Sequence, residues 1–149
     1  MLSDRTSVEL IQYNSREYRQ ACELRYRLFF AEHNLPWAVV DNQSDRDYFH
    51  LAIIDREKLL AYAQLDSQEN LIYRIRQMVV EPSHQKQGLG RQILSTAIAL
   101  AIQKDATSVL LDSRLSAVGF YQTLGFETYG VEFPSSTTGV MHIAMKLEL

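Results

Sequence analysis

The segment Gln85-Lys-Gln-Gly-Leu-Gly-Arg91 holds the residues best suited to binding an anion. It lies between an apolar strand pattern and the start of a helical pattern. Gly88 and Gly90 carry no Cβ, so the backbone can turn tightly or approach a ligand closely. The first N–H groups of a helix have no partner within it, and the helix dipole attracts anions there. The spacing predicts a phosphate-binding loop with Lys86 and Arg91 beside it; a plain structural turn is the alternative.

Two familiar phosphate loops are excluded by the residues that follow the glycines. The P-loop requires Lys and then Ser or Thr after its last glycine, and neither pair is present. The dinucleotide-binding fingerprint requires a third glycine at the position of Ile93. The pattern that remains is Gln85-x-x-Gly88-x-Gly90.

Length and composition limit the class of protein. With 149 residues, 46% apolar and 22% charged, the chain predicts one globular domain, residues 1–149, with a substantial core. The net charge of −3 disfavours nucleic-acid binding. Neither a membrane span nor a signal peptide is recognisable, since Met1-Leu-Ser-Asp-Arg5 lacks an apolar region. A lone cysteine, Cys22, fits the cytoplasm and is expected to be a buried packing residue.

The first half of the chain predicts strands around one helix. Residues 8–13 form an edge strand, and Asn14 or Ser15 caps a helix over residues 16–33. Trp37–Val40 forms a short helix or a lid. The acidic segment 41–47 lacks the glycine and closing glutamate of a calcium loop, so we expect a solvated loop. Residues 49–54 and 59–65 form a hairpin.

The strand that precedes the glycine loop changes character along its length. Alternating apolar and polar residues from Leu71 to Arg76 predict a half-exposed strand. After Gln77 the alternation stops, and residues 78–80 are all apolar. Either a β-bulge or a strand end buried on both faces explains this change.

The remaining pattern predicts a helix over residues 89–104, a parallel strand over 108–112 and a second helix over 117–124. We expect Ser116 to cap that second helix and Gly125 to end it. Two final strands, 126–131 and 140–147, flank a polar loop over 134–139 that is mobile or lies over a site.

Two motifs in this order resemble the GCN5-related N-acetyltransferase (GNAT) family. Gln85-x-x-Gly88-x-Gly90 is similar to its Gln/Arg-x-x-Gly-x-Gly/Ala signature, and Ala117-Val-Gly-Phe-Tyr-Gln-Thr-Leu-Gly-Phe126 to its Ala-x-x-Phe-Tyr-x-x-x-Gly-Phe segment. The resemblance covers nearly the whole chain. It implies an α/β (α+β) fold: one mixed, mostly antiparallel sheet of six to seven strands, splayed between strands 4 and 5, with about four helices.

Weaker similarities point to small stand-alone members of that family. They are the helix Leu24–His33, the residues Asp41, Asp45 and His50, and the segment Gly139–Met145, where Met141 replaces a proline. These matches add little about the acceptor.

The resemblance implies transfer of an acetyl group from acetyl-CoA to a primary amine, by direct attack in a ternary complex. The amine belongs to a small molecule or a peptide; no metal, nucleic acid or membrane is expected, and a homodimer is compatible. A non-catalytic acyl-CoA sensor and a nucleotide- or phosphate-binding module are the alternatives. Tyr121 is the expected general acid, with ring packing against Phe120 and Phe126 as the other interpretation. The expected acetyl-CoA contacts are Met78, Val79, Val80, Gln85, Lys86, Gln87, Gly88, Leu89, Gly90, Arg91, Ala117, Phe120 and Tyr121.

The general base is not identified by the sequence. Six residues are conceivable near the centre of the sheet, although Glu81 is expected to be a solvated turn residue. A water chain could also serve. The candidates are Tyr73, Gln77, Glu81, Asp112, His50 and His142.

Overall fold

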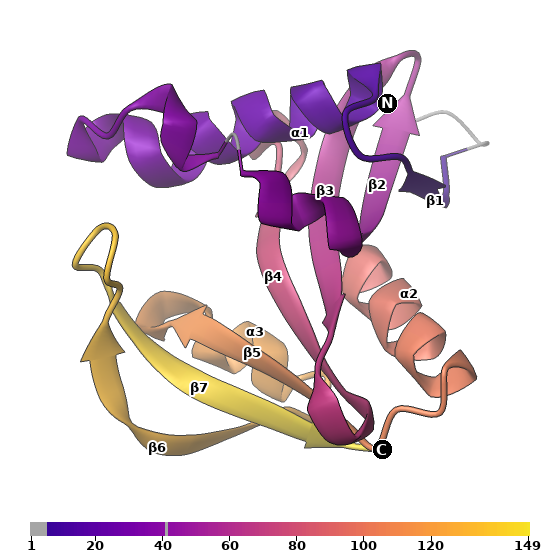
Figure 1. Cartoon of the computed structure of the whole chain (residues 1–149), viewed down its shortest axis with the longest axis vertical. Helices are drawn as coiled ribbons and strands as arrows, with labels where there is room; N and C mark the ends of the chain where they lie inside the picture. The colour runs from indigo at the N-terminus through magenta and orange to yellow at the C-terminus, as the bar shows by residue number, and fades with distance from the viewer. Residues whose placement is uncertain (1–5, 41) are drawn as a thin grey trace.

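The computed structural model describes residues 6–40 and 42–149, so the expectations for Asp41 and for the first five residues lie outside it. Its centre is a mixed seven-stranded sheet with the order β1-β2-β3-β4-β5-β7-β6 (Figure 1). Among the strands of the described residues, β4–β5 is the only parallel pair. The strands are β1 (Val8–Ile11), β2 (Phe49–Asp55), β3 (Lys58–Ser67), β4 (Ile72–Val80), β5 (Ser108–Arg114), β6 (Glu127–Pro134) and β7 (Met141–Glu148).

Strands β4 and β5 pair over a short distance and then separate. Their register joins Ile72 to Ser108 and Arg74 to Leu110, and no pairing follows beyond that point. Figure 1 shows the two strands together near the C-terminus and divergent beyond it. The predicted splay is confirmed, and it leaves backbone groups of both strands available along the gap.

In the part of the chain that the structure describes, three α-helices cover the sheet: α1 (Arg16–Arg25), α2 (Leu89–Gln103) and α3 (Val118–Gln122). The Ser15 side chain accepts a hydrogen bond from the Tyr18 N–H and caps α1, as predicted. Gly125 follows α3 with φ +96°, which suits a glycine that ends a helix. None of the helices within the described residues has both the length and the apolar character needed to cross a membrane.

The predicted single helix over residues 16–33 is wrong beyond Arg25. The chain continues as a π turn, η1 (Tyr26–Phe30), and a 3₁₀ turn, Ala31–His33. A π turn holds more residues than an α-helical turn and so changes the direction of the side chains within it. Phe29 and Phe30 consequently both line the cleft described below. The helix expected over 117–124 is likewise shorter, since α3 spans only Val118–Gln122. The expected cap at Ser116 is wrong, because Ser116 lies inside the 3₁₀ turn Leu115–Ala117 and no side chain among the described residues caps α3.

The two faces of the sheet are covered by different helices. On one face, Ile93 of α2 and Tyr121 of α3 share a core with Ile75 of β4. On the other face, Leu24 of α1 packs with Tyr62 of β3. We call these the α2/α3 face and the α1 face.

Candidate functional site

Strand β4 carries a β-bulge at Gln77. Arg76 pairs with Gln64 and Val79 with Tyr62, so β4 advances three residues where β3 advances two. Gln77 has a positive φ of 55°, a backbone conformation that is rare for a residue with a side chain. The bulge is therefore confirmed as the reason that the alternation stops.

The bulge also changes which residues of β4 point to each face of the sheet. Before it, Tyr73 and Ile75 pack on the α2/α3 face; after it, Met78 and Val80 do so. Val79 turns to the α1 face and packs beside α1. One extra residue accounts for this exchange, because the side-chain period of a strand is two.

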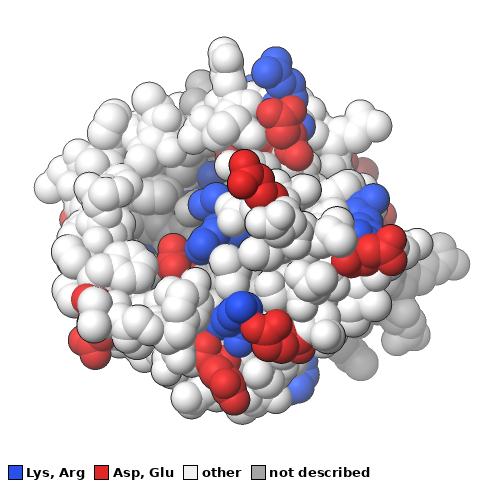
Figure 2. Space-filling model, turned by 60° about the horizontal axis from the view of Figure 1, so that its bottom comes forward, with Lys and Arg blue, Asp and Glu red and all other residues white. Residues whose placement is uncertain are grey.

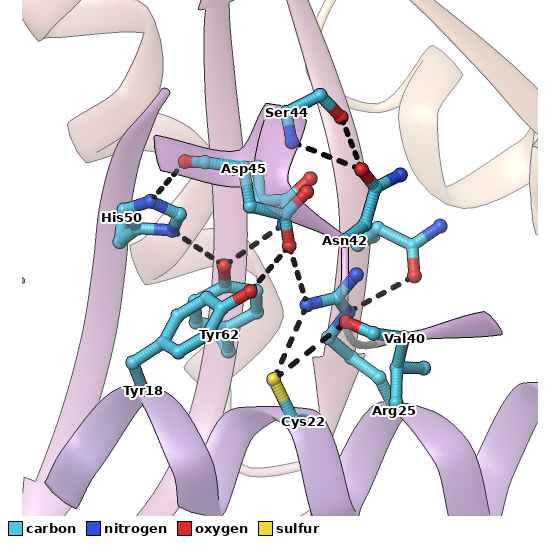
Figure 3. Close-up of polar contacts among 11 residues, drawn as sticks. Tyr18, Cys22, Arg25, Val40, Asn42, Ser44, Asp45, His50 and Tyr62 are labelled. Carbon is cyan, nitrogen blue, oxygen red and sulfur yellow. Dashed lines mark hydrogen bonds and ion pairs between the residues drawn. The ribbon is translucent and has the colours of Figure 1, made fainter. Parts of the chain in front are cut away.

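A buried polar cluster on the α1 face holds the Gln77 side chain. The Arg25 Nε donates to Gln77 Oε1 at 3.1 Å, and Arg25 Nη1 donates to Asp45 Oδ2 at 3.1 Å. The Tyr18 hydroxyl donates to the same Asp45 oxygen at 2.6 Å (Figure 3). Burial on its own lowers the pKa of Arg25, but Coulombic interactions, those with Tyr62 and Asp45 the largest, more than offset it and the net direction is upward.

The expectation of a solvated 41–47 loop is wrong for Asp45. Its side chain is only 4% exposed, as is that of Arg25. Burying a guanidinium costs free energy unless a carboxylate and hydrogen bonds satisfy it, so Asp45 is buried beside Arg25. Cys22 is also buried, as predicted, and its Sγ accepts from Arg25 Nη1 at 3.8 Å.

His50 belongs to this cluster, and both of its ring nitrogens are hydrogen-bonded within it. Its Nε2 donates to the Asp45 carbonyl oxygen at 2.7 Å, and the Tyr62 hydroxyl donates to its Nδ1 at 2.6 Å. Gln64 Nε2 donates in turn to the Tyr62 hydroxyl at 3.0 Å. Burial lowers the pKa of His50, which keeps the ring neutral at pH 7.

The glycine loop exposes unpaired backbone donors where α2 begins. Lys86 and Gly88 have positive φ values of 63° and 82°, and α2 starts at Leu89. Within the described residues, the N–H groups of residues 86–88 make no backbone hydrogen bond, and the first N–H groups of α2 have no partner in the helix. A Cβ placed on Gly88 would meet no atom within 4 Å. The loop is thus open to an anion.

The side chains of the loop have more limited roles. Gln85 Nε2 donates to the Val80 carbonyl oxygen at 3.3 Å, and Arg91 Nη2 donates to Thr123 Oγ1 at 2.9 Å. Lys86 and Gln87 are exposed, whereas Leu89 is buried in the core. A Cβ on Gly90 would lie 3.5 Å from Phe120 Cζ, so this glycine allows α2 to pack beside α3.

We expect Gly88→Val to abolish detectable CoA binding and leave the protein folded. Valine at a positive φ costs about 1–2 kcal/mol and redirects the loop N–H groups. Lys86→Ala should cost about 1 kcal/mol or less, because an exposed charge contributes little. Calorimetric titration with CoA measures both. Gly130→Val is the matched control, since Gly130 also has a positive φ, 76°, and open space around it. Equal losses for Lys86→Ala and Gly88→Val would show that side-chain charge carries the site.

A cleft of about 410 Å³ occupies the gap between β4 and β5. Figure 2 shows the hollow with blue, positively charged side chains at its edge and an acidic one beside them. Its α2/α3 side is lined by Ile75, Met78, Leu111, Ala117 and Tyr121. Its other side is lined by Phe29, Phe30, Arg74, Arg76, Gln77, Asp112, Arg114, Phe133 and His142, with residues of the β6–β7 loop.

The residues expected to contact acetyl-CoA therefore lie in three places: in the cleft lining, in the core beside the cleft, and in the glycine loop. Met78, Ala117 and Tyr121 line the cleft. Val80 and Phe120 pack against the core beside it. Residues 85–91 lie beyond the cleft lining, past the end of β4 at the start of α2.

Tyr121 lines the cleft, and its ring is packed against two phenylalanines. Its ring meets Phe120 and Phe126 edge-on, at centroid distances of 5.3 and 6.0 Å. Burial raises the pKa of the phenol to about 12, so it stays protonated across the physiological range. The hydroxyl has no hydrogen-bond partner in the part of the chain that the structure describes, although Tyr121 lines the cleft.

His142 lines the cleft, and one of its ring nitrogens has no hydrogen-bond partner among the described residues. Its Nδ1 lies 2.8 Å from the Val140 carbonyl oxygen, which can only accept, so Nδ1 carries the proton. In the neutral ring Nε2 holds the lone pair, and no partner for it occurs among residues 6–40 and 42–149. Phe133 stacks on the ring at 6.2 Å and holds its orientation.

The other conceivable bases are engaged or distant. Glu81 is wrongly expected to be solvated: it is 8% exposed, and its two carboxylate oxygens accept from Arg27 at 3.3 and 3.0 Å. Tyr73 is buried in the core and does not line the cleft. Asp112 is paired with Arg74 at 3.3 Å. Gln77 has no basic group, which leaves His142 as the best placed.

The sequence analysis did not identify several residues on the α1 side of the cleft. Arg114 follows Asp112 at a spacing of two on β5, so strand alternation could have placed both on one face. Phe29, Phe30 and Phe133 gave no local signal, because they reach the cleft through the π turn and the β6–β7 pairing.

Comparison with known proteins gives consistent matches over nearly the whole chain. The model of the acetyltransferase (GNAT) domain family matches residues 15–149. The UPF0039 protein C11D3.02c of Schizosaccharomyces pombe is 30% identical over 129 residues, 85% of this chain and 84% of that protein. Escherichia coli ElaA superposes with a TM-score of 0.79 at 22% identity, covering 96% of this chain and 99% of ElaA. An aminoglycoside 6'-N-acetyltransferase complexed with coenzyme A superposes with a TM-score of 0.76 at 16% identity, covering 95% and 96%.

Proposed function

The chain belongs to the GNAT acetyltransferase family, and on that premise we propose that it transfers an acetyl group from acetyl-CoA to a primary amine. The observation that carries the proposal is the alignment of three features along one strand. The open N–H loop follows the end of β4, the bulge at Gln77 lies a few residues earlier, and the cleft opens beside that bulge.

The loop and the α2/α3 side of the cleft are suited to CoA. Unpaired N–H groups at residues 86–91 fit the pyrophosphate, and the open space at Gly88 lets it approach. Backbone groups near Met78, freed by the splay, would bind the pantetheine arm. Acetyl-CoA supplies an acyl group activated as a thioester.

The residues at the cleft would move the protons of the transfer. His142 Nε2 accepts a proton from the bound ammonium group, and the neutral amine then attacks the thioester carbonyl to form the C–N bond; the second proton leaves the nitrogen to water as the intermediate collapses. The Tyr121 hydroxyl donates its proton to the thiolate sulfur as the C–S bond breaks. Backbone N–H groups at the bulge would stabilise the developing oxyanion. Cys22 is buried in the polar cluster and is not among the residues that line the cleft, so it is not placed to form an acyl-enzyme.

Two measurements test the proposal against its alternatives. Calorimetric titration compares CoA with ATP, and release of free thiol from acetyl-CoA is then followed with a panel of amines. CoA binding with amine-dependent thiol release supports the enzyme. CoA binding without release on any amine would favour a sensor, and binding of ATP but not CoA would favour a nucleotide-binding module.

We expect Tyr121→Phe to lower kcat ~10²-fold with acetyl-CoA affinity nearly unchanged. Phenylalanine keeps the ring that packs on Phe120 and Phe126 and removes only the proton. Steady-state kinetics measures kcat, and calorimetry measures the affinity for acetyl-CoA. Because burial raises the pKa of the phenol to about 12, any alkaline loss of rate well below that pH belongs to another group. Wild-type turnover with a slow chemical step would show that the thiolate leaves unaided.

A further inference from the structure

The α1 side of the cleft is positively charged although the chain carries a net charge of −3. Arg74, Arg76 and Arg114 line the cleft, with Asp112 as the acidic residue among the lining side chains. Arg74 pairs with Asp112 at 3.3 Å, and Arg76 pairs with Asp66 at 3.1 Å. These two arginines are therefore neutralised within the protein.

Arg114 is left with an uncompensated charge. No carboxylate lies within ion-pair distance of it in the described residues, and its contact is the Phe29 ring, 5.0 Å from Cζ to the centroid. The stacked ring orients the guanidinium without neutralising it. A planar, partly buried guanidinium in this state is suited to bidentate binding of a carboxylate or a phosphate.

The strand register places Arg114 beside His142. Arg114 and His142 are direct cross-strand partners in the β5–β7 ladder, so their side chains leave the same face as neighbours. A ligand can therefore give its amine proton to His142 while its anionic group binds Arg114 only if a few bonds separate the amine from the anionic group. Phe29, Phe30 and Phe133 line the same side of the cleft and offer apolar surface to the rest of the molecule.

We propose that the acceptor is a small primary amine that carries a carboxylate or phosphate close to the amine, and that Arg114 binds this anion. The inference rests on the proposed function, because it assigns the α1 side of the cleft to the amine. The net contribution of hydrogen bonds to a charged group corresponds to binding of the anionic amine about 10- to 100-fold more tightly than its neutral analogue.

The test measures how tightly each amine binds to the complex of the protein with CoA, so the result does not depend on turnover. Phenylalanine is compared with phenylalaninamide, and O-phosphoethanolamine with ethanolamine, by calorimetric titration in saturating CoA. We expect the anionic member of at least one pair to bind tenfold or more tightly, and the responding pair identifies the anion as carboxylate or phosphate. Arg114→Gln should abolish the preference and leave the Kd for CoA unchanged. Arg114→Lys keeps the charge without the planar fork, and should retain part of the preference.

The outcomes separate the two proposals. Arg56→Gln, in the exposed β2–β3 turn, is the control and should preserve the preference. Absence of CoA binding would overturn the proposed function and this inference with it. CoA binding without a preference in either pair, or a preference that persists in Arg114→Gln, would overturn the inference alone.

Discussion

We expect His142→Asn to lower kcat by ~10³-fold, with the Kd for acetyl-CoA unchanged. The Asn amide nitrogen occupies the place of Nδ1 and can still donate to the Val140 carbonyl oxygen, so the strand end keeps its hydrogen bond. What is lost is the lone pair on Nε2. In this variant only amine that is already deprotonated in solution can attack the thioester. At neutral pH this neutral form is a small fraction of the total amine.

The pH dependence distinguishes a base from a structural residue. Because raising the pH increases the fraction of neutral amine, the deficit of His142→Asn should shrink as the pH rises toward the amine pKa. A structural defect would give the same deficit at every pH. His33→Asn, outside the cleft lining, should match the wild type. Unchanged kcat in His142→Asn, with chemistry shown to be slow by single-turnover kinetics, would assign the proton to a water chain.

The second large effect concerns stability. Asp45→Asn should lower the free energy of unfolding by about 3–5 kcal/mol, since it leaves the Arg25 guanidinium buried without a counter-charge. Urea denaturation at pH 7 measures the change. Glu57→Gln breaks an ion pair with Arg16 in which both side chains are more than two-thirds exposed, and should cause no measurable change. A loss below about 1 kcal/mol for Asp45→Asn would show that water or another group compensates Arg25.

The same cluster connects stability to the site. Arg25 donates to Gln77 at the bulge, so loss of Asp45 frees Arg25 to move and removes a restraint on a backbone held at positive φ. We interpret the cluster as a support for the bulge, the point of β4 that borders the cleft.

Local patterns in the sequence determined most of the architecture. The alternation of Leu71 to Arg76 and the apolar stripe of residues 89–104 depend on periods of two and 3.6 residues, which any stretch of chain displays by itself. The open loop at Gly88 follows from the same local logic, because a glycine before a helical pattern marks where free N–H groups occur. These features need no knowledge of distant contacts.

The tertiary structure alone decided which polar side chains are buried and which meet at the cleft. Arg25 and Gln77 are 52 positions apart, and Arg27 and Glu81 are 54 apart. Nothing in the composition around Asp45 or Glu81 shows that a guanidinium lies opposite, so both were expected in solvent. Arg114 and His142 likewise become neighbours only through the order β5-β7-β6, which places the last strand but one at the edge. A charge is buried only where its partner is present, and that partner is supplied by the sheet topology and not by the local sequence.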